Sequence, residues 1–355
     1  MNNPFLSVII PLYNNESLIE RCVNSILAQP FRDLEIIIVN DGSKDNSAEI
    51  ADALAVKHQN IQVVHQTNAG VSAARNHGIH LAKGNYLVFC DSDDLWIDNV
   101  LTHEFVNDIV SNPAEVICCG FFRRIGSAQV KLSMDGQVGS RTIGPEFIHI
   151  PYSKYHVCSQ LYLRSFIRKY DIMFKEGLKV TEDKLFVDMC FYCSDTVRFI
   201  DHPFYVYFDN PASIMNSKWD VFGTLMHSFN GRMWESQVIG QKRSYGATAD
   251  AATIKTLQAL AVGCILEMLQ AHFSDSLSMK RARQQLEHYG LTPYLDTYEQ
   301  YYSSGPVADE FRLFQTHPYL FAWKYRIKGF IKSTVRRLLP KSMVEKKRLQ
   351  NASNA

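Results

Sequence analysis

The sequence lacks a strong charge of either sign. Its 355 residues carry a formal net charge of +1, and 46% of them are hydrophobic and 21% charged. A near-neutral chain exerts no general electrostatic attraction on nucleic acid, so nucleic acid is not an expected partner. The apolar content argues against a disordered chain, and the length allows a full core with a smaller second unit.

Long apolar runs are also missing. No stretch of eighteen apolar residues occurs, and residues 1–5 lack a basic segment followed by an apolar one. These absences predict a cytoplasmic protein that does not span a membrane. Eight scattered cysteines fit that compartment as mostly buried thiols. Cys190 and Cys193 form one CxxC pair without a second, which favours core thiols over a tetrahedral zinc site.

Short apolar runs alternate with amphipathic segments over the first ninety residues. We expect strands at 6–11, 34–39, 61–64 and 86–90, and helices at 18–27, 47–57 and 71–82, the first capped by Asn14 or Asn15. Alternation of this kind predicts a parallel sheet with right-handed crossovers. Ligands bind beyond the carboxyl ends of such strands, so the polar loops after these four strands are expected to share one face.

The fourth expected strand is followed directly by Asp91-Ser92-Asp93-Asp94. Three carboxylates in four residues repel one another unless a cation or solvent compensates them. If the period of two continues from the strand, Asp91 and Asp93 point the same way and can hold Mg²⁺ or Mn²⁺. The alternative is an acidic cap, with Asp94 or Asp98 starting the next helix.

Two other polar segments lie at expected loop positions. Asp41 follows the second strand and can accept hydrogen bonds from a base or ribose, although an ordinary Asp-Gly turn explains it equally. Arg75 lies among small residues near the start of the third helix and can reach a nucleotide. Its alternative role is a surface salt bridge.

Four segments together resemble the inverting family 2 glycosyltransferases of GT-A fold: SVIIPLYN at 7–14, VNDGSKD at 39–45, ARNHG at 74–78 and GNYLVFCDSDD at 84–94. The resemblance implies an α/β fold, with a Rossmann-like, mostly parallel sheet flanked by helices and a helical C-terminal extension. It also implies a non-processive enzyme of cell-surface polysaccharide or oligosaccharide biosynthesis. Such an enzyme transfers a sugar from a nucleotide-diphosphate sugar, here a UDP-sugar, to a saccharide or lipid-linked acceptor.

The resemblance further implies roles for single residues. Tyr13 would stack on the base, Asp41 and Arg75 would contact the uridine, and Asp91 and Asp93 would form the DxD element, with Asp93 the more direct ligand of Mn²⁺ or Mg²⁺. The full set of implied nucleotide-binding residues is Pro11, Tyr13, Asn14, Glu16, Asp41, Gly42, Ser43, Arg75, Asp91 and Ser92.

The later segment Thr181-Glu182-Asp183 resembles the family's Glu-Asp segment, and Asp183 is the expected catalytic base. A carboxylate beside a second acid, partly shielded by apolar neighbours, has its pKa raised and becomes a better proton acceptor. The alternative is an acid that stabilises the N-terminus of a helix.

Two departures from the family pattern stand out. Asn40 replaces the first of two acids before Gly-Ser, and the segment from Tyr207 to Ile214 lacks the arginine that follows the tyrosine. Rival functions fit less well. A nicotinamide dehydrogenase would require a glycine-rich turn after the first strand, and no glycine occurs between Pro11 and Asn15. A processive synthase would bring membrane helices and a Gln-x-x-Arg-Trp element. A non-catalytic nucleotide-sugar-binding module remains the alternative.

The sequence suggests three parts: a nucleotide-sugar-binding and catalytic domain at 1–218, a helical region at 219–320 and a basic amphipathic tail at 321–355. Residues 321–348 hold ten basic residues and one acid, a net +9, so the remainder carries −8. Apolar residues recur there at near-helical spacing: Phe321, Tyr325, Ile327, Phe330, Ile331, Val335, Leu338 and Leu339. This pattern predicts either peripheral binding to an anionic membrane or a packing helix with a solvated basic face.

Overall fold

The computed structural model describes residues 3–125, 128–132, 138–149, 156–208, 221–274 and 278–338. The chain divides into two compact units. Among the described residues, the first holds those up to 178 and 182–208, and the second holds 179–181 and 221–338. The predicted division into 1–218, 219–320 and 321–355 stays a prediction. Residues 209–220, around its first boundary, lie outside the described residues.

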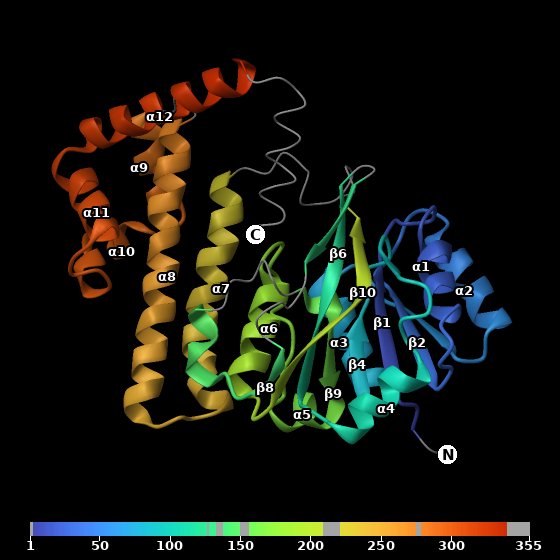
Figure 1. The fold of residues 1–355 in the computed structure, drawn as a ribbon. Helices are drawn as coiled ribbons and strands as arrows, with labels where there is room; N and C mark the ends of the chain where they lie inside the picture. The colour runs from blue at the N-terminus through green and yellow to red at the C-terminus, as the bar shows by residue number, and fades with distance from the viewer. Residues whose placement is uncertain are drawn as a thin grey trace. The chain divides into compact units, whose positions relative to one another are not determined.

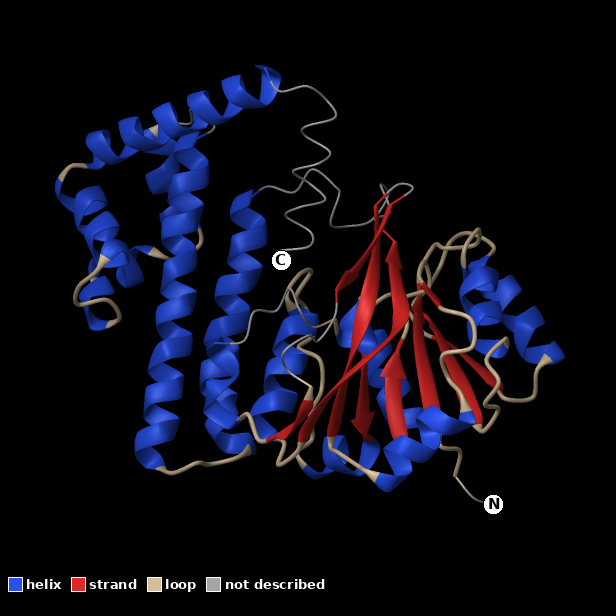
Figure 2. Cartoon of the chain, in the orientation of Figure 1, coloured by secondary structure: helices blue, strands red, loops and turns tan. Residues whose placement is uncertain are grey.

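The first unit is built on one mixed sheet with the strand order β3-β2-β1-β4-β9-β6-β10-β5; β7 pairs with β6 and β8 with β10 (Figures 1 and 2). The strands are β1 (Leu6–Leu12), β2 (Leu34–Asn40), β3 (Ile61–His65), β4 (Tyr86–Phe89), β5 (Leu95–Trp96), β6 (Val116–Ile125), β7 (Ala128–Leu132), β8 (Gly139–Arg141), β9 (Gln160–Leu163) and β10 (Val197–Phe208). The pairs β1–β2, β2–β3 and β1–β4 are parallel, as predicted. Strand β9 runs antiparallel to both of its neighbours, β4 and β6.

Helices connect and cover these strands. They are α1 (Ile19–Leu27), α2 (Ser47–Lys57), α3 (Val71–Leu81), α4 (His103–Ser111), α5 (Arg164–Lys169) and α6 (Glu182–Cys193), with short 3₁₀ helices at Gly144–His149 and Val157–Ser159. Right-handed crossovers place α1 and α2 on one face of the sheet and α3 on the other. The chain returns past β1 to form β4, so the strand order reverses at β1, which is the position at which open α/β sheets commonly bind ligands.

The core of this unit explains why the central strands form. Both β1 and β2 are rich in β-branched residues, and Val8, Ile9, Ile37 and Ile38 are fully buried, as expected for strands covered on both faces. Helix α3 packs very closely on β1 at Gly78, where an added Cβ would lie 2.3 Å from the side chain of Ile9. Glycine at this position therefore lets α3 reach the sheet.

Two sequence-based predictions for this unit are wrong. Neither Asn14 nor Asn15 caps α1, whose N-cap position is Leu18 without a side-chain hydrogen bond. No helix starts at Asp94 or Asp98 either, because the chain first forms β5. The next helix, α4, is capped by Thr102, which accepts a hydrogen bond from the Phe105 amide (3.1 Å).

The cysteines are mostly buried thiols, as predicted. All eight cysteines are free thiols and seven are buried. Cys190 and Cys193 lie on α6 and are both fully buried. The CxxC spacing is therefore that of core thiols.

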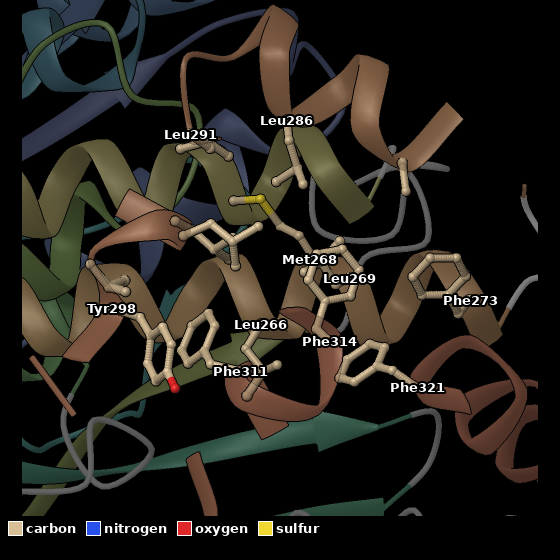
Figure 3. Close-up of a cluster of buried hydrophobic side chains, with 14 of the residues drawn as sticks. Leu266, Met268, Leu269, Phe273, Leu286, Leu291, Tyr298, Phe311, Phe314 and Phe321 are labelled. Atoms are coloured by element: carbon tan, nitrogen blue, oxygen red, sulfur yellow. The ribbon is translucent and has the colours of Figure 1, made fainter. Parts of the chain in front are cut away.

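The second unit is helical: α7 (Val221–Lys242), α8 (Ala247–Ser274), α9 (Met279–His288), α10 (Thr292–Asp296), α11 (Pro306–Thr316) and α12 (Pro318–Leu338), with a 3₁₀ helix at Tyr298–Gln300. Its core gathers around α8, where Met268, Leu269 and Phe273 meet Phe311 and Phe314 (Figure 3). Seven of the nineteen buried residues of this cluster are aromatic and the rest are aliphatic, so burial of apolar surface is its main source of stability.

Helix α8 is relevant to whether the chain spans a membrane. Within the described ranges it is the one helix whose length and composition would allow it to cross a bilayer. A core helix of a water-soluble protein meets the same two conditions, and Leu257, Val262 and Leu269 are buried inside the unit. The expectation that no segment spans a membrane stays a prediction.

Candidate active site

The loops after β1 and β2 are joined by reciprocal hydrogen bonds. The amide of Asn14 donates to Ser43 Oγ (3.0 Å), while Asn14 Oδ1 accepts from the amide of Lys44 (2.7 Å). Glu16 Oε2 accepts from the amide of Asn46 (2.9 Å). The structure thus brings together three predicted nucleotide contacts, Asn14, Glu16 and Ser43, and shows that in the free protein they bind the neighbouring loop.

Asp41 holds the loop after β3. Its carboxylate is buried and accepts three hydrogen bonds of 2.8 Å, from Gln66 Nε2 and from the amides of Ala69 and Gly70. Gly42 has a φ of +70°, and an added Cβ would lie 2.9 Å from a backbone nitrogen of the same loop. Both residues therefore shape this loop, and direct contact of Asp41 with a nucleotide stays a prediction.

The acidic segment after β4 forms a turn. Regular strand geometry ends at Phe89, and the amide of Asp94 donates to the carbonyl of Asp91 (3.0 Å). The expected period of two therefore does not continue through the acids. Ser92 Oγ accepts from Asn15 Nδ2 (2.8 Å), which ties the turn to the loop after β1. The loops after β1, β2, β3 and β4 are thus joined to one another by hydrogen bonds. They lie together at the carboxyl ends of the strands, as predicted.

Asp94 fastens the same turn to β10. Its carboxyl group is buried and bonded to the Tyr205 hydroxyl and the Phe208 amide. Burial, reinforced by the charges of Asp91 and Asp93, raises the pKa of Asp94 well above its usual value. This third acid is therefore a structural group, and Asp91 and Asp93 stay the predicted cation ligands.

Arg75 connects the acidic turn to α6. Its buried guanidinium donates from Nη2 to Asp91 Oδ1 (2.8 Å) and from Nη1 to Glu182 Oε1 (3.4 Å), and it lies over the ring of Phe174 (5.1 Å). The surface salt bridge that was the alternative role for Arg75 is therefore wrong, because the Arg75 guanidinium is buried. Three segments that are far apart in the sequence meet at this one side chain.

The two acids bonded to Arg75 have opposite pKa shifts. Burial alone would raise the pKa of Asp91, but the charges of Arg75 and His156, together with hydrogen bonds from Arg75 and Cys158, lower it on balance. The pKa of Glu182 is raised to about 7, first by burial and then by the charge of Asp183. At neutral pH, Asp91 is therefore ionised, whereas Glu182 is close to its midpoint of titration.

Asp183, the predicted base, lies in the first turn of α6, beside the acid that contacts Arg75. It is partly exposed, and its Oδ1 accepts from the amide of Lys184 (2.7 Å). The raised pKa expected in this segment occurs at the more deeply buried Glu182. Proton abstraction by Asp183 stays a prediction.

His156, which no sequence pattern indicated, also lies at the site. Its ring stacks on Tyr205 (5.3 Å) and its Nδ1 accepts from the amide of Cys158 (3.3 Å). Burial lowers the pKa of His156, whereas the charges of Asp91 and Asp183 act in the opposite direction. His156 is thus neutral at pH 7 with its hydrogen on Nε2, and no local motif marks it.

The acids suit a cation that is shared with a substrate. The structure has no group of three or more His, Cys, Asp or Glu side chains in its described ranges that could hold a metal ion. Asp91 keeps 26% of its side chain exposed beside Asp93. Mg²⁺ and similar hard cations are commonly bound through one or two carboxylates plus substrate phosphates, so Asp91 and Asp93 fit that role.

Comparison with known proteins identifies the fold and the family. Residues 7–171 match the model of glycosyl transferase family 2, a range that holds the four linked loops, Arg75 and the acidic turn. The chain carries a family 2 glycosyltransferase domain. The matched range ends before Asp183, so it does not include the predicted base.

Named relatives agree with this glycosyltransferase domain. The chain is 32% identical over 217 residues to the uncharacterized glycosyltransferase EpsJ of Bacillus subtilis, covering 59% of this chain and 63% of EpsJ. It is also 32% identical over 218 residues to the uncharacterized glycosyltransferase YibD of Escherichia coli, covering 59% and 62%. The chain therefore spans less than two thirds of either relative.

A solved structure shares the fold. Residues 1–349 of S. aureus TarS, crystallised with UDP-GlcNAc, superpose with a TM-score of 0.64 and 19% identity, covering 95% of this chain and 92% of that one. The predicted fold class, a GT-A-like, mostly parallel sheet flanked by helices with further helices at the C-terminus, is confirmed.

Proposed function

We propose that this glycosyltransferase domain transfers a sugar, with inversion, from a nucleotide-diphosphate sugar to a hydroxyl of a saccharide or lipid-linked acceptor in cell-surface polysaccharide biosynthesis. The observation that supports this best is Arg75, which bonds at once to Asp91 and Glu182. It joins the acids suited to a diphosphate-bound cation to the helix turn that carries Asp183. This connection supports the proposal that the diphosphate and the acceptor hydroxyl bind at one site.

The donor side is formed by the linked loops after β1 and β2. Tyr13 directly follows β1, and its ring is 46% exposed, so it is free to stack on a base. We take the donor to be a UDP-sugar, because TarS, which shares the fold, was crystallised with UDP-GlcNAc and with UDP.

The proposed reaction is a single displacement. Asp183 accepts the proton of the acceptor hydroxyl while that oxygen bonds to the anomeric carbon; the bond to the diphosphate breaks, and the electron pair leaves with the diphosphate. Mn²⁺ or Mg²⁺ at Asp91 and Asp93 would supply positive charge to the departing group. Arg75 keeps Asp91 ionised and oriented, and His156 retains an N–H donor close to the acids.

The test uses Asp183→Asn in the full chain. We expect transfer from a panel of UDP-, GDP- and dTDP-sugars with Mn²⁺ to fall by about 10²–10⁴-fold for the accepted donor, because the proton acceptor is lost. Calorimetry should show unchanged nucleotide binding. The matched control is Asp201→Asn, a partly exposed acid of the same unit that pairs with Lys131 and should keep full activity. Near-normal turnover by Asp183→Asn would remove Asp183 from the mechanism.

The same panel separates an enzyme from a non-catalytic nucleotide-sugar-binding module. An enzyme releases nucleoside diphosphate from at least one donor in a metal-dependent way, and NMR of the product shows an inverted anomer. A binding module would bind a nucleotide sugar and release nothing with any donor.

A further inference from the structure

Helix α12 presents two different apolar faces. Phe321, Ala322 and Tyr325 are buried in the core of the second unit. The ring of Phe321 lies 5.3 Å from that of Phe314 and 6.0 Å from that of Phe273 (Figure 3). For Phe321 and Tyr325 the sequence left open a membrane-binding stripe or a packing helix. Both side chains pack in the core of the second unit. The side chains of the other expected residues beyond Lys328 lie outside the described ones.

The second face is exposed. Tyr319 is 78% exposed, Leu320 51%, Trp323 61% and Ile327 37%. Positions 319, 323 and 327 follow each other at intervals of four, and 320 precedes 323 by three and 327 by seven, so the four side chains share one side of the helix. We call them the α12 apolar face.

This clustering is unusual within the molecule. Nine large hydrophobic side chains are exposed among the described residues, and four of them belong to the α12 apolar face; the other five are Tyr13, Val56, Val110, Val138 and Leu260. Single exposed apolar residues need no explanation, whereas a contiguous group, two of them aromatic, indicates an interaction surface.

Charge indicates the kind of partner. Lys324, Arg326 and Lys328 lie on the same turns as the α12 apolar face, and residues 321–348 carry a net +9. Lys324 is paired with Glu310, while Arg326 and Lys328 are exposed. Trp and Tyr favour the interface of a bilayer, and each basic residue near an anionic surface adds electrostatic attraction.

We propose that the α12 apolar face inserts into the interface of an anionic lipid bilayer, with the basic side chains beside it bound to lipid headgroups. A second copy of the chain fits this face less well, because joining two such helices would bring like charges together. The proposal rests on the second unit alone and does not depend on glycosyl transfer.

The experiment is flotation of the full chain with two kinds of vesicle, pure phosphatidylcholine and phosphatidylcholine mixed with phosphatidylglycerol. We expect binding to the anionic vesicles only, weakened by salt. The triple variant Tyr319→Ser, Leu320→Ser, Trp323→Ser should bind at least about tenfold more weakly, because its apolar side chains can no longer insert. These side chains are exposed, so circular dichroism should show an intact fold.

Two controls make the result specific. The double variant Val56→Ser, Val110→Ser removes equally exposed apolar side chains from the first unit and should float like the unchanged protein. Trp323→Phe should still float but lose the blue shift of tryptophan emission that insertion of Trp323 produces.

Three outcomes would overturn the proposal. One is absence of vesicle binding by the unchanged chain. Another is full binding by the triple variant, which would assign membrane contact to another segment. The third is an unchanged protein that dimerises by light scattering without vesicles while the triple variant is monomeric, which would make the face a contact between copies.

Discussion

Arg75 in the first unit and Phe273 in the second are both buried side chains, each at the centre of a cluster. The contacts of Arg75 are ion pairs, whereas those of Phe273 are apolar. Arg75 is bound by two carboxylates from segments far apart in the sequence. Phe273 is surrounded by rings, among them Phe314 and Phe321. The first arrangement depends on charge and exact partners, whereas the second depends mainly on volume. We therefore expect substitutions in the two units to differ in how they depend on pH, on neighbours and on activity.

The largest effect should follow Arg75→Met. This variant leaves Asp91 and Glu182 buried without their cation, which is expected to destabilise the first unit by about 3–5 kcal/mol and to abolish transfer. Urea unfolding measures the loss, and hydrogen exchange locates it in β1 and β4. Arg312→Met is the control, because its pair with Asp309 is exposed and contributes less than about 1 kcal/mol. Equal losses in the two variants would contradict a structural role for the buried pair.

Phe273→Ala should destabilise the second unit by about 3 kcal/mol or more, since it leaves a cavity in the aromatic cluster. Hydrogen exchange should increase in α8 and α11, while nucleotide binding by the first unit stays unchanged. Leu260→Ala on the same helix, at a position 41% exposed, should cost less than about 0.5 kcal/mol. Equal sensitivity at the two positions would contradict the proposed core.

Glu182→Gln tests how the stability of the first unit depends on pH. The folded pKa of Glu182 is raised to about 7 from 4.5, so the folded state binds its proton more tightly than the unfolded state. The unchanged protein should therefore lose stability relative to the variant as pH rises from 4.5 to 7, and the difference should stay constant above that. Chemical unfolding at a series of pH values measures it; a difference independent of pH would refute the raised pKa.

The smallest effects should come from matched helix caps in the two units. Thr102 caps α4 and Ser278 caps α9, each by accepting a hydrogen bond from the amide three residues on. Replacing either by alanine should cost about 1 kcal/mol. Thermal or urea unfolding that shows no loss for one variant would mean that water replaces that cap.

The sequence predicted the elements that depend on local pattern. Helix α2 begins at Ser47 and ends at Lys57 as expected, and β1 and β2 were found from buried β-branched runs. Predictions failed where a distant partner competes. Asn14 was expected to cap α1 but bonds instead to the loop some thirty residues later, because polar side chains satisfy whichever backbone groups lie nearest in space.

The candidate site was only partly predictable for the same reason. The acids after β4 and Arg75 were found from the motif, but their ion pair depends on how closely α3 approaches β1. His156 belongs to no periodic segment, and tertiary contacts alone bring it to the acids. On α12, helical spacing revealed apolar positions but left open whether each of them meets a membrane or the protein, and Phe321 packs in the protein core.

The reciprocal hydrogen bonds between the loops after β1 and β2 bear on the entropy of donor binding. Asn14 is already held in a left-handed conformation with a φ of +49°, and both its amide and its side chain are engaged. Since these loops have little motion left to lose, the ordering cost of the proposed complex falls mainly on the arriving nucleotide. The proposed donor site would thus be assembled already when the chain folds.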